Sequence, residues 1–170
     1  MNNIYLKNII RFILLVLLQV LVLNNMNLMG YMNPYVYILF ILLLPADISG
    51  VLLLLLAFLT GITIDFFGNT LGLNAAATVL MAFTRPKVLN LFFKNIEFGQ
   101  NEEPGIAKMG FGKFLRYVFI LVLIHHTALF FLEVFSFQEF RDTVYRIIIS
   151  SVFSTFIIMI LVLLFGKRKQ

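Results

Sequence analysis

The chain has no cysteine among its 170 residues, and only 12% of them are charged. Without cysteine it can form neither a disulfide framework nor a thiolate metal site, and cysteine usage says nothing about the redox compartment. So little charge beside 61% hydrophobic residues excludes an ordinary soluble globular domain. The composition therefore predicts an all-α integral membrane protein that crosses the bilayer several times.

Signatures of chemistry are also missing. The sequence contains no nucleophile elbow, phosphate-binding loop, paired catalytic carboxylates or dinucleotide fingerprint. The net charge of +5 does not indicate nucleic-acid binding, because the basic residues lie almost entirely at the chain ends and in one loop. We therefore expect no enzymatic activity, no cofactor and no nucleic-acid partner.

Apolar segments predict one membrane domain of six helices of unequal length, at about residues 8–28, 35–46, 48–67, 71–84, 117–135 and 147–165. The first has a basic start like a signal peptide, but no small-residue cleavage site follows, so we expect a retained helix. Residues 35–44, between two prolines, cover only about half of a hydrocarbon core that is roughly 30 Å thick. The second helix is therefore tilted and extended, lies where the bilayer thins, or does not cross. The fourth is also short and is expected to end at Arg85 and Pro86.

The basic residues indicate the orientation. Eleven of the thirteen lie in the first segment, in a solvated loop predicted at 85–116 or at the end of the chain, and Arg141 and Arg146 lie opposite. The positive-inside rule then places both termini and the central loop in the cytoplasm. The start of that loop, KVLNLFFKNIEF, has the pattern of an amphipathic helix on the membrane surface.

Residues 48–80 form the predicted centre of the bundle. On a helix, small residues and one acid share a stripe that lets a neighbouring helix approach closely: Gly50, Ala57, Gly61, Asp65 and Gly68. The acid lies in the last turn, where the helix dipole disfavours negative charge. Two interpretations stay open for Asp65: an acid that reaches water at the headgroups, or a structural polar contact to a facing helix.

Two adjacent histidines, His125 and His126, interrupt the fifth segment, and intramembrane ionisable groups normally face the bundle or a wet cavity. Adjacent histidines diverge on a helix and lack further ligands, so we expect no metal site. His126 and Glu133 share a face, which leaves a proton relay as one alternative and neutral, hydrogen-bonded histidines as the simpler one. Arg146 is expected to pair with Asp65 or Glu133.

Four stretches, in this order, resemble the rod shape-determining protein MreD family over nearly the whole chain: NPYVYILFILLLP, GITIDFFGNTLGLNAAA, TRPKVL and IHHTALFFLE. The block typical of the family generally contains Gly61, Asp65, Gly68, Gly72 and Asn74, and the two histidines resemble one bacterial branch. None of these motifs is catalytic.

The resemblance implies a non-enzymatic scaffold in the bacterial inner membrane that regulates cell shape and lateral peptidoglycan synthesis. Its expected partner is MreC and, through MreC, MreB, RodA and its penicillin-binding transpeptidase. The implied fold is similar to the six unequal helices of the substrate-binding subunits of energy-coupling-factor transporters.

That fold also defines the rival hypothesis, a small-molecule (vitamin-type) binding subunit of a membrane transporter. In this alternative Asp65, Asn74, Glu133 and Arg146 converge on a ligand cavity near the outer leaflet. A third and weaker alternative is an intramembrane enzyme or proton channel that uses His126 and Glu133.

Overall fold

The computed structural model describes residues 4–25, 34–134 and 140–165, and all statements below concern these residues. Residues 26–28 of the predicted first helix, residue 135 of the fifth and the basic residues 167–169 lie outside this part. The described chain contains seven α-helices and no strand: α1 (Ile4–Leu17), α2 (Leu39–Leu42), α3 (Gly50–Gly68), α4 (Leu73–Phe92), α5 (Ile106–Met109), α6 (Phe111–Val134) and α7 (Phe140–Phe165). The predicted all-α class is confirmed.

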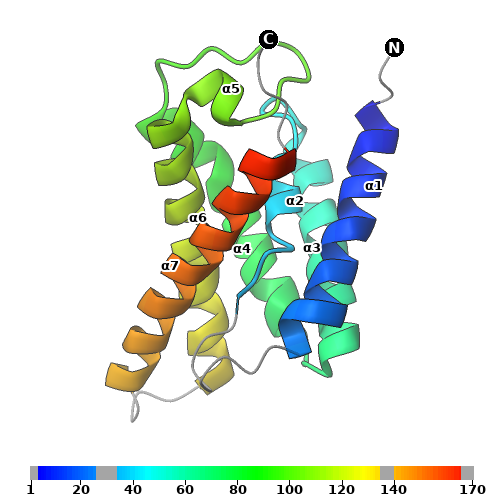
Figure 1. The fold of residues 1–170 in the computed structure, drawn as a ribbon, viewed down its shortest axis with the longest axis vertical. Helices are drawn as coiled ribbons and strands as arrows, with labels where there is room; N and C mark the ends of the chain where they lie inside the picture. Colours follow the sequence, from blue (N-terminus) through cyan, green and yellow to red (C-terminus); the bar gives the residue numbers. More distant parts are fainter. Residues whose placement is uncertain (1–3, 26–33, 135–139, 166–170) are drawn as a thin grey trace.

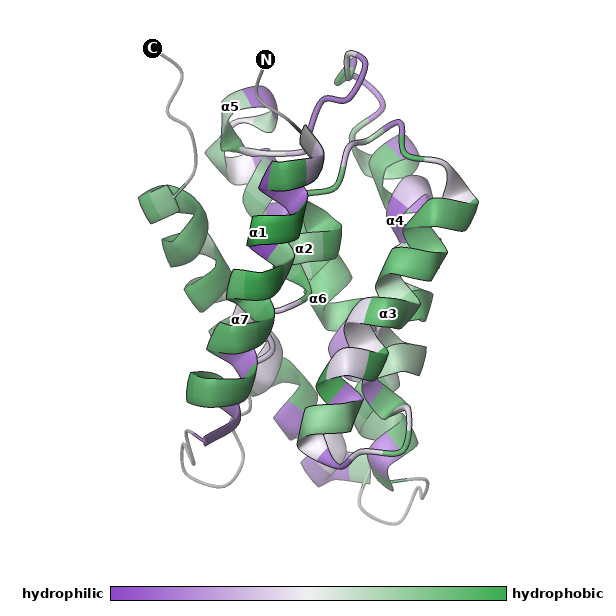
Figure 2. Cartoon of the chain, turned by 90° about the vertical axis from the view of Figure 1, so that its right-hand side faces the viewer, coloured by the Kyte–Doolittle hydropathy of each residue, from purple (hydrophilic) through white to green (hydrophobic). Residues whose placement is uncertain are grey.

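Four helical stretches of the described chain are long and apolar enough to cross a membrane: Tyr5–Asn25, Gly50–Gly68, Phe111–Val134 and Phe140–Phe165. The first of them continues α1 through a π-helical turn (Leu18–Val22) and a 3-10 turn (Leu23–Asn25). Figure 2 shows the long helices as mainly hydrophobic and the loop between α4 and α5 as mainly hydrophilic. The protein is therefore a multi-pass α-helical membrane protein.

The long helices run alongside one another between two ends of the molecule (Figure 1). α1 and α3 run in the same direction, and the described chain that precedes α3, from residue 34, returns through the interior of the bundle. α4 then runs antiparallel to α3, and α7 antiparallel to α6, so the start of α1 and the end of α7 both lie at the end that carries α5. The strongest packing joins α3 to α4, α4 to α6 and α6 to α7.

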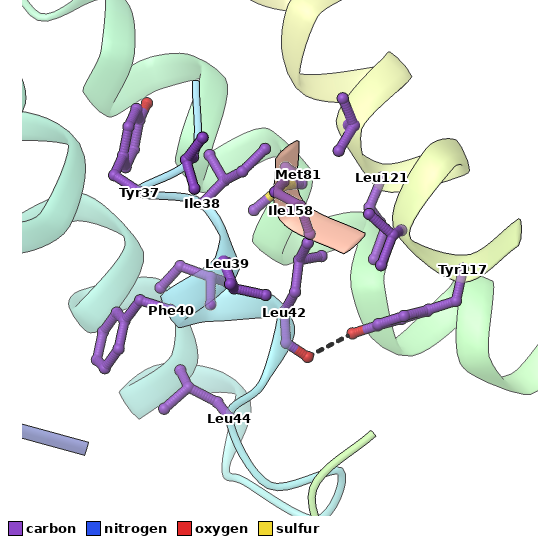
Figure 3. Close-up of a cluster of buried hydrophobic side chains, with 14 of the residues drawn as sticks. Tyr37, Ile38, Leu39, Phe40, Leu42, Leu44, Met81, Tyr117, Leu121 and Ile158 are labelled. Atoms are coloured by element: carbon purple, nitrogen blue, oxygen red, sulfur yellow. Dashed lines mark hydrogen bonds between the residues drawn. The ribbon is translucent and has the colours of Figure 1, made fainter. Parts of the chain in front are cut away.

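The prediction of a second helix at 35–46 is wrong, because only the four residues of α2 are helical there. Residues 34–46 instead form a mostly irregular segment in which nearly every side chain is buried, and we call it the inner segment. Figure 3 shows its side chains, including Ile38 and Leu42, packed among Met81, Leu121 and Ile158 of the surrounding helices. A buried irregular segment is as uniformly apolar as a buried helix, so hydrophobicity alone could not separate the two.

The predicted boundaries of the fourth helix and of the central loop are also wrong. α4 does not end at Arg85 and Pro86 but continues to Phe92, with the proline inside the helix. An interior proline costs about 3 kcal/mol, and burial of Val88 and Leu89 beyond it offsets this cost. The first half of the predicted surface helix thus belongs to α4, and the loop is shortened to 93–110. α6 and α7 begin earlier than predicted, because helices extend past their apolar part into the interface.

Candidate functional site

The middle of the predicted small-residue stripe on α3 is buried inside the bundle. Ala57, Gly61 and Asp65 are buried, and Gly61 and Asp65 contact α4, whereas Gly50 and Gly68, at the two ends of the stripe, are exposed. A Cβ added to Gly61 would lie 2.7 Å from the backbone nitrogen of Ala75 and closer still to its Cα. Only glycine therefore permits this approach of the two helices, which is how helices associate in lipid.

Asp65 is 2% exposed and binds the first turn of α4. Its Oδ1 accepts hydrogen bonds from the backbone nitrogen and the Nδ2 of Asn74, both at 3.0 Å, and its Oδ2 accepts one from the backbone nitrogen of Ala75 at 2.9 Å. The Thr70 hydroxyl also donates to Oδ1. The carboxylate thus caps the positive end of α4, where a negative charge is favoured. Of the two interpretations for Asp65, the structure supports the second, a structural polar contact to a facing helix.

The turn between the two helices depends on residues with positive φ. Asn69, at the C-cap of α3, has φ 52°, and Gly72, at the N-cap of α4, has φ 83°. No other atom lies within 4 Å of a Cβ built on Gly72, so glycine is required there for its backbone conformation and not for space. This conformation aims the first amides of α4 at Asp65.

Tyr37 of the inner segment is the centre of a buried polar cluster. Its hydroxyl lies 2.8 Å from Nε2 of His125, 2.9 Å from Oγ1 of Thr78 and 3.3 Å from Oδ1 of Asn74. All four residues are at most 4% exposed. Since Asn74 also bonds to Asp65, the cluster connects the α3–α4 corner to α6. Sequence analysis missed Tyr37 and Thr78, because a tyrosine and a threonine in apolar runs carry no signal of partners distant in the sequence.

His126 belongs to a second chain of hydrogen bonds. Its Nδ1 lies 2.9 Å from the carbonyl of Val122 and its Nε2 3.1 Å from Oγ of Ser154 on α7. The same Ser154 oxygen accepts a hydrogen bond from the backbone nitrogen of Tyr35 at 3.0 Å. A carbonyl only accepts, so Nδ1 carries a proton, and in the neutral ring Nε2 accepts from the serine hydroxyl. His126 is fully buried within the bundle, where the neutral ring is favoured over the charged one, and Glu133 is not its partner in these bonds.

The backbone of the inner segment bonds to polar side chains of the surrounding helices. Gln19, which is 1% exposed, accepts from the backbone nitrogen of Val36 at 2.8 Å and donates to the carbonyl of Pro34 at 2.9 Å. The Tyr117 hydroxyl donates to the carbonyl of Leu42 at 2.9 Å (Figure 3). Irregular backbone at membrane depth is tolerated only when such groups are satisfied inside the protein. These side chains therefore allow an irregular segment to remain in the interior.

Arg85 is the largest of these side chains and is 1% exposed, so its placement in a solvated loop is corrected. Its guanidinium donates from Nε to the Tyr117 hydroxyl at 2.9 Å, from Nη1 to the carbonyl of Pro45, and from Nη2 to the carbonyls of both Leu44 and Pro45. Five donors in a rigid fork suit arginine to holding several carbonyls at once. Arg85 thus fixes the corner at which the inner segment leaves the bundle.

The loop between α4 and α6 is joined to α1 by ion pairs. Glu103 lies 2.7 Å from Nζ of Lys7 and 2.9 Å from Nη2 of Arg11, and the neighbouring Glu102 carbonyl accepts from the backbone nitrogen of Ala46 at 2.9 Å. Burial alone would raise the pKa of Glu103, but the hydrogen bonds and positive charges of Arg11 and Lys7 outweigh it and lower this pKa below its ordinary value.

At the opposite end, Arg146 on α7 lies 3.1 Å from Glu133 on α6 and over the ring of Phe130. Of the two pairings expected for Arg146, the structure forms the one with Glu133. Asp65 uses both carboxylate oxygens on the α3–α4 corner. The four residues of the ligand-cavity hypothesis therefore form two separate pairs, Asp65 with Asn74 and Glu133 with Arg146.

The described residues include no group of three or more histidine, aspartate or glutamate side chains placed to hold a metal ion. No protein-family model, no curated protein and no solved structure matches the chain. The contacts of the site itself cap a helix, hold the inner segment in the interior, and engage both histidines in hydrogen bonds.

Proposed function

We propose that this protein is a non-enzymatic inner-membrane scaffold of the cell-elongation complex, of the MreD kind, which acts by binding MreC. The observation that carries the proposal is how the interior polar groups are used. Asp65, Asn74, Gln19, Arg85 and His126 each bond to a neighbouring helix or to the inner segment. A framework whose polar groups are occupied in this way suits a rigid docking unit better than a reaction centre.

The proposal includes a six-pass topology with both termini in the cytoplasm. Four stretches are long and apolar enough to cross, and in the proposed topology the inner segment and α4 supply two further passes. In support, the start of α1 and the end of α7 lie at the end that carries α5 and the basic loop (Figure 1). Accessibility labelling of a single cysteine in the loop at 93–110, in intact and in opened cells, tests this topology. Labelling in intact cells would contradict it.

Co-purification with MreC tests the function directly. The tagged chain, extracted in mild detergent, is expected to retain co-expressed MreC, and its depletion is expected to make rod-shaped cells round. Retention of a small ligand and of an ATPase-coupled partner, without MreC, would overturn the proposal in favour of the transporter subunit.

The absence of cysteine allows the contact surface to be mapped. Single cysteines at exposed positions of different helices, Ile13 on α1, Phe58 on α3 and Val152 on α7, can be cross-linked to cysteines in the membrane helix of MreC. The scaffold proposal predicts cross-links from one face only. Phe114, which is fully buried, provides the control position. Equal cross-linking from all three exposed positions would indicate random collision.

A further inference from the structure

Basic residues at the end that carries α5 fall into two groups. Some are engaged within the protein: Lys7 and Arg11 bond to Glu103, Lys108 pairs with Glu102 at 2.8 Å, and Arg85 is buried. Others are exposed and form none of the ion pairs of the described residues: Lys87, Lys94, Lys113 and Arg116. Lys87 lies over the ring of Phe83 at 4.5 Å, and we call the other three, Lys94, Lys113 and Arg116, the α4–α6 basic patch.

The fold brings the patch together at one seam. α4 and α6 pack side by side, and the rings of Phe93 and Tyr117 lie 6.2 Å apart where the end of α4 meets the start of α6. Lys94 and Arg116 directly adjoin this ring pair in the sequence. Lys113 precedes Arg116 by about one helical turn and therefore shares its face. The patch thus combines one end of α4 with the beginning of α6, next to α5 (Figure 1).

The local acids do not neutralise the patch. Glu102 and Glu103 are held by Lys108, Lys7 and Arg11, and Asp47 accepts a hydrogen bond from the backbone nitrogen of Asn101 at 3.0 Å. Glu97 is exposed and is the remaining acid of the loop. The patch therefore keeps an excess of positive charge at the boundary between the apolar helices and water.

We propose that the α4–α6 basic patch binds the phosphate headgroups of anionic phospholipids. Lysine and arginine side chains next to a membrane helix attract anionic headgroups, and each contributes up to about a fivefold factor in lipid affinity. Phe92 and Phe111 are exposed beside the patch, where acyl chains would lie below a bound headgroup. The proposal does not depend on the scaffold function, because it needs only the surface of the isolated protein.

The test compares two variants that each lose three positive charges. The patch variant carries Lys94→Gln, Lys113→Gln and Arg116→Gln. The control variant carries Arg141→Gln, Lys167→Gln and Lys169→Gln, which lie outside the patch and outside the ion pairs of the described residues. Native mass spectrometry of the detergent-solubilised protein measures the retention of phosphatidylglycerol relative to phosphatidylcholine. We expect this ratio to fall at least about tenfold in the patch variant and less than about threefold in the control.

Two results would overturn the proposal. An equal fall in both variants would show that only total charge matters, and an unchanged ratio in the patch variant would show that the patch does not bind headgroups. A charge-preserving variant, Lys94→Arg, Lys113→Arg and Arg116→Lys, should keep the ratio of the unmodified protein. The single change Arg116→Gln should also lower the ratio of retained phosphatidylglycerol to phosphatidylcholine. This exposed side chain can be replaced without disturbing the fold.

Discussion

Asp65 shows how a single carboxylate is accommodated inside a membrane bundle. Its own helix ends next to it, which is unfavourable for a negative charge, but the following helix begins there and presents its unpaired amides. The carboxylate accepts from two of these amides and from two side chains, and so it is fully hydrogen-bonded. A charged group that would otherwise be costly in the interior thereby stabilises the α3–α4 corner.

Replacement of this carboxylate should therefore destabilise the protein. Asp65→Ala leaves two buried amides of α4 without an acceptor and should cost about 2 kcal/mol or more. Asp65→Asn keeps one acceptor oxygen and should cost less. Thermal unfolding in detergent measures both, and a melting temperature of Asp65→Ala equal to that of the unmodified protein would contradict the capping role.

The two adjacent histidines are expected to be neutral in opposite tautomers. His126 donates from Nδ1 to a carbonyl. In the Tyr37 cluster the Thr78 hydroxyl donates to the carbonyl of Asn74 at 2.7 Å, so it can accept from the Tyr37 hydroxyl while that oxygen accepts from Nε2 of His125. The single proton of the Tyr37 hydroxyl then lies between the oxygens of Thr78 and Asn74, of which Thr78 is the nearer, and the Nδ1 of His125 keeps a bare lone pair without a partner.

Nitrogen-15 NMR of histidine-labelled protein at neutral pH tests this assignment. We expect one ring protonated at Nδ1 and one at Nε2, with the signals assigned by Tyr37→Phe, which removes the acceptor of His125 only. Two rings in the same tautomer would show that the hydrogen-bond directions are wrong.

At the scale of elements, the inner segment depends on side chains that come from other parts of the chain. Gln19 lies at a π-helical turn, where the altered helical register coincides with its bonds to residues 34 and 36. Its amide supplies both an acceptor and a donor, as a neighbouring strand would. One side chain thus replaces the backbone partner that an extended segment lacks in the bundle.

Gln19→Met keeps the shape of this side chain and removes both hydrogen-bonding groups. It should cost about 2 to 4 kcal/mol, because a buried amide and a carbonyl are left unpaired. Chemical unfolding measures the loss, with Thr63→Val as the control, since that hydroxyl bonds only within its own helix. Equal stability of the two variants would show that the inner segment does not need the glutamine.

The close packing of α3 on α4 gives another prediction at this scale. Gly61→Leu should cost about 1 to 3 kcal/mol, since its side chain would meet the backbone of α4, and Gly61→Ala should already be destabilising. Gly50→Ala, on the same helix, meets no atom within 4 Å and should be neutral or slightly stabilising. If the two alanine variants unfold at the same temperature, the helices do not approach as closely as the structure shows.

At the scale of the whole molecule, the loop at 93–110 is held to α1 and to the inner segment through Glu102 and Glu103. Because the folded-state pKa of Glu103 is lowered, its ion pairs stabilise this arrangement fully above the ordinary glutamate pKa of about 4.3. The stabilisation is lost as the pH falls through the lowered value. Acid should therefore release the loop while the apolar bundle remains.

Hydrogen exchange at the Ala46 amide, corrected for the intrinsic effect of pH, reports this release. Protection should fall below about pH 4 in the unmodified protein, and Glu103→Gln should have low protection that hardly changes with pH. If Glu103→Gln still loses protection at the Ala46 amide as the pH falls, the transition belongs to another titrating group.

Much of the helical architecture followed from hydrophobic length, and the α3–α4 corner from its glycines and asparagines. The packing at Gly61 and the pairing of Arg146 with Glu133 could be anticipated, because helical periodicity and charge complementarity act over short ranges. The contacts of Tyr37, Gln19 and Arg85 could not, since their partners lie 15 to 88 residues away. Nor could the end of α4, because burial beyond Pro86 overrides a local helix-breaking signal.

The amino-acid sequence by itself determined that this chain enters a membrane, that its long apolar segments are helical, and that two of these helices can approach closely. These properties depend on composition and on spacing along the chain. Only the tertiary structure decided that residues 34–46 remain mostly irregular inside the bundle and that Asp65 caps α4. A backbone amide outside regular secondary structure, or a buried charge, is stable in the interior only when another group bonds to it. Folding brings that group from a distant part of the chain.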